Sequence, residues 1–131
     1  MARIKHIAFI TLDTEKMAKF YTEVMGLEIL HRGDNGSVFL TDGYLNIALL
    51  PNKAEGKPNG LNHFGFEVEN LDEVARKFER AGMAAPRKRP ADRHYAEYRA
   101  TDPDGNNFDL SSNGFATVRK ERTRTADPVT V

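Results

Sequence analysis

An internal repeat runs through most of this 131-residue chain. The segment His6-Ile7-Ala8-Phe9 returns as His63-Phe64-Gly65-Phe66, and each copy continues into a helical pattern that ends at a glycine, Gly26 in the first copy and Gly82 in the second. Self-similarity of this kind indicates two copies of one supersecondary unit. Because a unit of this size is too small to close a sheet alone, we expect the two copies to share one.

The first copy predicts one helix and four strands. Asp13 precedes apolar residues at helical spacing, which predicts a capped helix over about 14–25. Asp34-Asn35-Gly36 is typical of a hairpin turn. Runs of apolar residues, bounded by turn residues, predict strands at residues 4–10, 27–30, 37–40 and 44–50.

The second copy follows the same order. Asn70 can cap a second helix, with Glu73 as its capping-box partner, and Gly82 ends that helix. The basic, proline-containing segment 86–93 predicts a loop. Strands are expected at residues 62–68, 83–85, 95–101 and 107–111.

The predicted fold class is α+β: two tandem βαβββ modules that form a curved, cupped mixed sheet with the helices outside. The concave face of such a sheet is a natural pocket. We expect a single domain, with module one at about 1–50, a linker at 51–59, module two at about 60–113 and a C-terminal tail at 114–131. Because the tail is polar and rich in Thr and Arg, we expect it to be loose or to lie on a partner subunit.

The composition excludes several classes of function. The formal net charge is +0, so no strong field attracts nucleic acid or an anionic membrane. The absence of cysteine excludes disulfide scaffolds, thiol catalysis and cysteine-based zinc sites. No apolar run approaches the roughly 20 residues of a membrane span, and the N-terminus has no signal-peptide core. We therefore expect a cytoplasmic protein.

A carboxylate lies in the middle of the last predicted strand. Pro103-Asp104-Gly105 predicts a tight turn, because Pro fixes φ and Gly supplies a positive φ. In the strand that follows, Phe108 and Leu110 point to one face and Asp109 points to the other. Either the face of Asp109 meets solvent, or Asp109 serves as a ligand or a base.

Two histidines favour the ligand interpretation. His6 and His63 occupy equivalent places in the two copies, so pseudo-symmetry predicts that they face the same cavity, where Asp109 can join them. Two neutral imidazoles and one carboxylate suit a divalent metal ion. A lone strand histidine is more often a structural residue than a ligand. The repetition of the histidine, together with the acid, favours a metal site with open positions for water, substrate or O₂.

At this point the residues resemble a known family, the vicinal oxygen chelate superfamily. It includes glyoxalase I, extradiol ring-cleaving dioxygenases, methylmalonyl-CoA epimerase, and fosfomycin and bleomycin resistance proteins. The resemblance covers about residues 1–113. Its matching pieces are Lys5-His6-Ile7, the helix end from Lys19-Phe20-Tyr21 to Gly26-Leu27, the restart at His63, and Asp102-Pro103-Asp104-Gly105-Asn106.

The resemblance implies metal ligands at His6, His63 and Asp109. The final acid of the family is usually Glu, and Asp is one methylene shorter. The glyoxalase I pattern also has a Glu at the end of module one, where this chain has Ala48, and Asn46 is the nearest polar residue on the same face. The remaining set resembles the two-histidine, one-carboxylate triad of the extradiol dioxygenases. Fe(II) or Mn(II) is the favoured ion, with Zn(II) or Ni(II) as alternatives.

The resemblance also implies a nearby acid/base residue, for which His94, Tyr95 and Tyr98 are candidates. His94 and Tyr98 are the two that we predict to be catalytic. The alternatives are an exposed loop histidine for His94 and a core aromatic for Tyr98. The basic residues Arg87, Lys88, Arg89 and Arg93 either attract an anionic substrate or form a solvated loop, and His31 is assigned no role.

Three functions remain open on the sequence. The first is a metal-dependent dioxygenase acting on a small catechol-type molecule that chelates the metal through vicinal oxygens. The second is a glyoxalase- or epimerase-like lyase or isomerase, with water or Asn46 in place of the missing ligand. The third is a metal-free drug-binding resistance protein. A small-molecule substrate and a homodimer are expected in either enzyme, with no nucleic-acid or membrane partner.

Overall fold

The computed structural model describes residues 2–53, 58–90 and 96–112, in two compact units. Within the described part, one unit, called the module-one unit, holds residues 6–53 and 58–62. The other, called the module-two unit, holds residues 2–5, 63–90 and 96–112. The predicted C-terminal tail at 114–131 lies outside the described residues.

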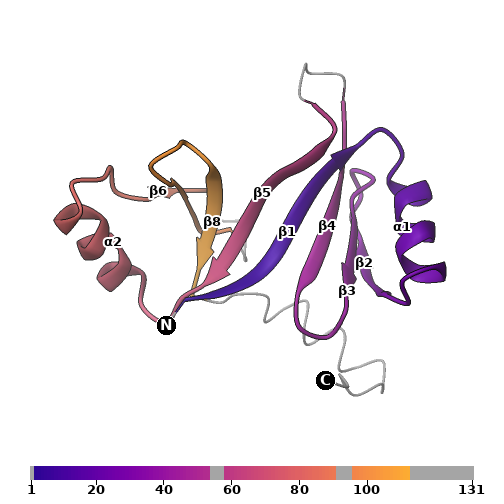
Figure 1. The fold of residues 1–131 in the computed structure, drawn as a ribbon, viewed down its shortest axis with the longest axis horizontal. Helices are drawn as coiled ribbons and strands as arrows, with labels where there is room; N and C mark the ends of the chain where they lie inside the picture. Colours follow the sequence, from indigo (N-terminus) through magenta and orange to yellow (C-terminus); the bar gives the residue numbers. More distant parts are fainter. Residues whose placement is uncertain (1, 54–57, 91–95, 113–131) are drawn as a thin grey trace. The chain divides into compact units, whose positions relative to one another are not determined.

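In the described residues, two helices and eight strands follow one another as βαβββ twice (Figure 1). The first series is β1 (Arg3–Thr11), α1 (Thr14–Glu23), β2 (Glu28–Arg32), β3 (Val38–Thr41) and β4 (Asn46–Pro51). The second series is β5 (Gly60–Glu67), α2 (Leu71–Arg80), β6 (Arg87–Lys88), β7 (Tyr98–Thr101) and β8 (Asn107–Ser111). Parallel and antiparallel pairs occur in both series, so the predicted α+β class with mixed pairing is confirmed.

In the module-one unit the strands lie in the order β2-β3-β4-β1, with β4 parallel to β1 and the other pairs antiparallel. Helix α1 packs on β2, β3 and β4 (Figure 1). Asp13 caps this helix, as predicted, because its Oδ1 accepts a hydrogen bond from the backbone N–H of Lys16 at 2.9 Å. The core between helix and strands is built on the buried residues Ala18, Val38, Leu40 and Leu49.

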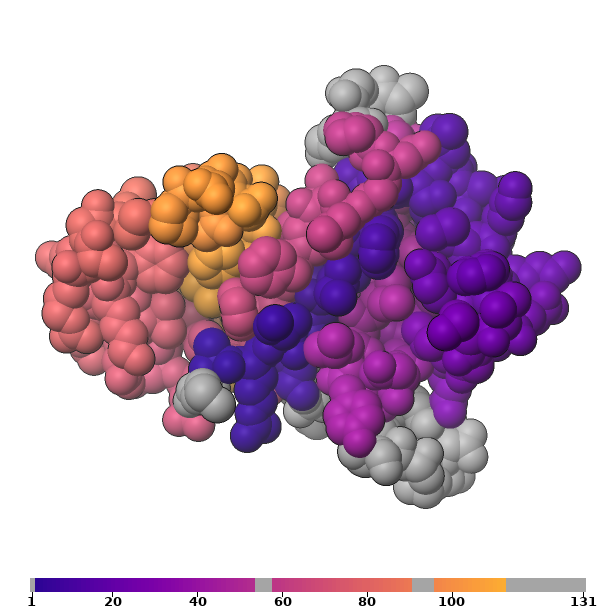
Figure 2. All heavy atoms as spheres, viewed as in Figure 1, coloured from indigo at the N-terminus to yellow at the C-terminus, as the bar shows by residue number. Residues whose placement is uncertain are grey.

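In the module-two unit the order is β5-β8-β7-β6, with β8 parallel to β5 and antiparallel to β7. Asn70 caps α2 as predicted, since its Oδ1 accepts from the backbone N–H of Glu73 at 3.0 Å. The helix packs on a cluster that contains Val68, Ala100, Phe108 and Leu110. Figure 2 shows the residues of α2, in salmon, beside those of the segment after residue 96, in orange.

Two predictions about the segment after α2 are wrong. Residues 83–85 form no strand, and a two-residue strand, β6, lies instead within the segment 86–93 that was predicted to be a loop. The pairing of Arg87 with Arg99 and of Lys88 with Tyr98 creates β6. Such pairing depends on a neighbour distant in sequence, so local propensity does not reveal it. The last strand, by contrast, runs over Asn107–Ser111, as predicted.

The turn between β7 and β8 is organised by Asp102. Its Oδ1 accepts from the backbone N–H groups of Asp104 and Asn106, at 3.0 and 2.9 Å, and its Oδ2 accepts from Nδ2 of Asn106 at 2.8 Å. Gly105 has φ of +86°, a conformation that L side chains rarely adopt. The turn sets the β7–β8 register, because Thr101 pairs with Asn107 directly outside it.

The pKa of Asp102 is lowered, chiefly by the side-chain hydrogen bond from Asn106. A lowered folded-state pKa stabilises the fold above the unfolded-state value, near 3.8, and this stabilisation disappears as pH falls through the folded-state pKa. We expect Asp102→Asn to remove this part of the acid dependence. Urea unfolding between pH 2.5 and about 5 measures it, with Asp104→Asn as the control that removes a carboxylate from the same turn. An unchanged acid slope in Asp102→Asn would contradict the assignment.

Candidate metal centre

The strands of the module-two unit have one apolar face and one polar face. The register pairs Phe64 with Phe108, and Tyr98 with Leu110, so these four side chains lie on the apolar face with α2. Because side chains alternate along a strand, the residues between them lie on the opposite face. That polar face carries His63, Gly65, Glu67, Glu97, Arg99, Asp109 and Ser111.

Asp109 lies on the polar face and contacts side chains of both neighbouring strands. Its Oδ2 lies 3.1 Å from Nε2 of His63, which reaches it from β5. Its Oδ1 lies 2.9 Å from Nε of Arg99 and 2.9 Å from Nη2 of the same side chain, which reaches it from β7. Neighbouring strands on both sides of β8 therefore hold the carboxylate, one at each oxygen.

Burial makes these contacts necessary. The side chain of Asp109 is 3% exposed, that of His63 10% and that of Arg99 21%. An isolated carboxylate costs several kcal/mol to remove from water, on the order of the penalty estimated for any buried ion. The guanidinium of Arg99 offsets part of that cost with a charge-assisted hydrogen bond from Nε and an ion pair from Nη2. A buried, hydrogen-bonded carboxylate next to a histidine is the arrangement that a metal site or an acid/base pair requires.

A second carboxylate, Glu97, holds the end of β8. Its Oε1 accepts from Oγ of Ser111 at 2.7 Å, from the backbone N–H of Ser112 at 2.8 Å and from Oγ of Ser112 at 3.2 Å. Ser111 is fully buried on the same face as Asp109. These hydrogen bonds fix the C-terminal end of β8, two residues after Asp109.

His6 belongs to the module-one unit, where it is 2% exposed on β1. Its neighbour across the parallel β1–β4 pair is Asn46, and Ala8 pairs with Ala48 one step further along the same face. In module two, the equivalent β5–β8 pair places Gly65 beside Asp109. Ala48 thus occupies in module one the register position that Asp109 occupies in module two, and its methyl group cannot bind a metal.

The other predicted residues lie elsewhere. Tyr98 packs against the apolar cluster of the module-two unit, on the face opposite Asp109, so the structure does not bring the two together. His94 and Tyr95 lie outside the described residues. The catalytic roles of His94 and Tyr98 stay predictions. His31, which was assigned no role, stacks on Phe39 with ring centroids 5.9 Å apart.

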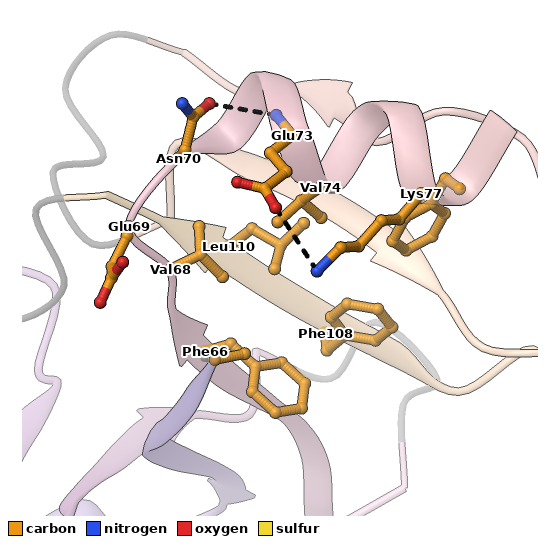
Figure 3. A pocket seen from close by; sticks show the side chains of 11 residues that line it. Phe66, Val68, Glu69, Asn70, Glu73, Val74, Lys77, Phe108 and Leu110 are labelled. Carbon is orange, nitrogen blue, oxygen red and sulfur yellow. Dashed lines mark hydrogen bonds and ion pairs between the residues drawn. The ribbon is translucent and has the colours of Figure 1, made fainter. Parts of the chain in front are cut away.

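A cavity of about 380 Å³ lies on the apolar side of the module-two unit (Figure 3). Its walls include Phe66, Phe108 and Leu110 from the strands and Val74 from α2, and an ion pair between Lys77 and Glu73 lies at its edge. Because these wall residues share the face opposite Asp109, this cavity and the polar face of the unit are separate.

Sequence reasoning missed Arg99. The sequence shows that Arg99 alternates with Tyr98 and Ala100 along the strand, but it does not show that Arg99 pairs with Asp109. The signal that could have found it is the turn: once Thr101 and Asn107 pair across it, counting outwards by two residues on each strand pairs Arg99 with Asp109.

Known proteins share sequence and fold with this chain. A family model described as the Glyoxalase/Bleomycin resistance protein/Dioxygenase superfamily matches residues 3–110. The chain is also similar to a Bacillus subtilis (strain 168) protein described as "Probable trivalent organoarsenical cleaving enzyme". The two are 33% identical over 113 residues, which cover 80% of this chain and 76% of that protein.

Among solved structures, the chain is similar to the 2,3-dioxygenase LapB from Pseudomonas sp. KL28, at 21% identity and a TM-score of 0.67. It is similar to the Mn(II)-bound glyoxalase from Novosphingobium aromaticivorans, at 23% identity and a TM-score of 0.61. Both matches cover 84% of this chain, but only 40% of the dioxygenase and 38% of the glyoxalase. The chain thus spans less than half of either protein, and the likeness establishes the fold alone.

The hydrogen bond from Ser111 to Glu97 gives a test of how the polar face is fixed. We expect Ser111→Ala to lower the free energy of unfolding by about 1.5–3 kcal/mol, the range for a hydrogen bond to a charged group. Ser112→Ala is the matched control, because Ser112 keeps its backbone contact with the same carboxylate oxygen and should lose less. Urea unfolding of both variants measures the difference, and equal losses would show that the buried hydroxyl has no special role.

Proposed function

Because the chain belongs to the Glyoxalase/Bleomycin resistance protein/Dioxygenase superfamily, we propose that it is a metal-dependent enzyme whose small-molecule substrate binds the ion through vicinal oxygens. The proposed reaction is extradiol-type ring cleavage of a catechol-like compound, in which both atoms of O₂ enter the product. The proposed ligands are His6, His63 and Asp109, and the favoured ion is Fe(II) or Mn(II), with Zn(II) or Ni(II) as alternatives.

The pairing of His63 with Asp109 is the observation that carries the proposal. Two ligand atoms bonded at right angles to one ion, at about 2.1 Å each, lie about 3 Å apart. The distance between Nε2 of His63 and Oδ2 of Asp109 is 3.1 Å. The same spacing also suits a hydrogen bond between the two side chains. An imidazole and a carboxylate at this spacing fit a divalent ion.

His6 is proposed as the third ligand on two grounds. The repeat gives it the place in module one that His63 has in module two. The parallel pairing of β1 with β4 also puts it on the same face as Ala48, which is the register equivalent of Asp109. Ala48 supplies no fourth ligand, which favours the three-ligand set of a ring-cleaving dioxygenase over a four-ligand glyoxalase set.

A divalent ion bound by this set would supply a positive centre for two substrate oxygens and would favour loss of their protons. The chain's own residues supply the surroundings. Asp109 provides one negative charge, Arg99 holds that charge in a fixed orientation, and burial of the carboxylate keeps bulk water away from it. His94 is predicted to move protons. It lies outside the described residues, so this role stays a proposal.

Cleavage of a carbon–arsenic bond is a second candidate, because the relative at 33% identity is described as a trivalent organoarsenical cleaving enzyme. Trivalent arsenic is a soft centre that prefers thiolate ligands. This sequence contains no cysteine, so the chain supplies no thiolate to hold such a substrate. The hard oxygen donors of a catechol suit a site of imidazole and carboxylate ligands better.

Metal analysis of the purified full chain tests the ligand set. We expect about one Fe(II) or Mn(II) per chain, and we expect His6→Ala, His63→Ala and Asp109→Ala each to weaken binding at least 100-fold, because each removes one of three ligands. His31→Ala is the matched control, since it removes a histidine from a strand outside the set. Undiminished metal content in the Asp109 variant would refute the assignment, and no metal in the wild type would favour the drug-binding alternative.

Oxygen uptake distinguishes the reactions. With the Fe(II)- or Mn(II)-loaded protein, we expect catechols to consume one O₂ per ring opened and to yield a coloured ring-opened product. A trivalent aryl arsenical and a glyoxalase-type hemithioacetal serve as the competing substrates in parallel assays. Turnover of either one, without oxygen uptake on any catechol, would overturn the dioxygenase proposal in favour of that reaction.

A further inference from the structure

Arg99 makes an unusual contact with Asp109. A guanidinium often binds a carboxylate with two parallel hydrogen bonds, one to each oxygen. Here Nε of Arg99 donates to Oδ1 at 2.9 Å, and Nη2 forms an ion pair with the same oxygen, also at 2.9 Å. The other oxygen, Oδ2, lies 3.1 Å from Nε2 of His63. The two oxygens of one carboxylate therefore have different neighbours.

We propose that Arg99 is a positioning residue that reserves Oδ1, so that Asp109 binds the metal through Oδ2 alone. This inference rests on the proposed function, since it concerns the same ion. It assigns Arg99 a role in keeping coordination positions open for substrate. It does not assign Arg99 a contact with substrate.

The number of carboxylate oxygens that bind the ion affects how many positions remain for substrate. A carboxylate binds a divalent ion through one oxygen or through both. In a six-coordinate ion held by three protein ligands, three positions remain for two substrate oxygens and O₂. A second oxygen from Asp109 would take one of them. Because Oδ1 already accepts a hydrogen bond from Nε of Arg99 and forms an ion pair with Nη2, we infer that this oxygen is withheld from the ion.

The pairing of β7 with β8 places Arg99 beside Asp109. Arg99 and Asp109 are direct partners in the antiparallel β7–β8 pair, so their side chains leave the sheet side by side on one face. Arg99 is 21% exposed at the side chain, and Asp109 is 3% exposed. The side chain of Arg99 thus keeps some contact with solvent, while its guanidinium reaches the buried carboxylate.

The positive charge of Arg99 determines how its replacement should change metal affinity and ligand affinity. A positive charge beside a ligand repels a divalent cation, so Arg99 does not serve to tighten metal binding. Replacing it removes that repulsion and frees Oδ1. We therefore expect a variant without the guanidinium to bind the ion as tightly as wild type or more so, and to bind a chelating ligand less well. A purely structural arginine would not separate these two affinities.

Cobalt(II) and 4-nitrocatechol provide the probes. The full chain is loaded with Co(II), whose visible absorption reports coordination number, and is then titrated with 4-nitrocatechol. For Arg99→Met we expect retained Co(II) binding, an altered visible spectrum and a 10- to 100-fold weaker affinity for 4-nitrocatechol, the usual scale for an outer-shell partner. Arg99→Lys, which keeps a donor and a charge near Oδ1, should recover most of that affinity.

Arg76→Met is the matched control, because Arg76 is an exposed arginine on α2, which packs on the face opposite Asp109. It should leave both the spectrum and the 4-nitrocatechol affinity unchanged. A wild-type spectrum and affinity in folded Arg99→Met would overturn the inference. If wild type itself binds no Co(II), the proposed function fails instead, so the two failures are distinguishable.

A crystal structure of the wild-type chain with Mn(II) decides the question even where Arg99→Met does not fold. One oxygen of Asp109 on the ion, with Arg99 on the other, supports the inference. Both oxygens of Asp109 on the ion would refute it.

Discussion

The burial of one carboxylate organises the module-two unit. Asp109 is almost fully enclosed, and a charge in that position is tolerated only when groups of opposite polarity face it. Arg99 and His63 meet that need from the strands on either side of β8. Both contacts require the strand register to be correct to one residue, because a slip by one would turn Asp109 to the other face.

The opposite face supplies the rigidity that this register needs. Phe64 and Phe108 stack with centroids 5.7 Å apart, and Phe66 meets Phe108 edge-on at 5.4 Å. Such aromatic contacts add to the apolar area that the strands bury, and they join β5 to β8 directly. Phe78 of α2 contacts the same ring of Phe108. One residue, Phe108, thus ties the helix and two strands together beside Asp109.

The sequence was sufficient for the features that depend on local chemistry. The repeat predicted the βαβββ order, Asp13 and Asn70 were identified as helix caps, and the turn before Asn107 located the last strand and the face of Asp109. Features that depend on pairing between strands were out of reach. Tyr98 and Arg99 are adjacent in the sequence, yet only Arg99 shares a face with Asp109, because the turn length sets which of the two pairs with it. β6 exists for the same reason, through its partner in β7.

The difference between the two modules bears on the charge of the proposed site. In module one the register position of Asp109 holds Ala48, so the proposed ligand set contains two neutral imidazoles and a single carboxylate. A divalent ion in such a set keeps a net charge of about one positive unit, whereas two carboxylates would cancel it. The guanidinium of Arg99 adds a further positive charge next to the carboxylate. Residual positive charge favours a substrate that loses protons as it binds, as the two hydroxyl groups of a catechol can. Ala48 in place of an acid and the presence of Arg99 therefore act in the same direction in the proposed site, towards an anionic chelating substrate.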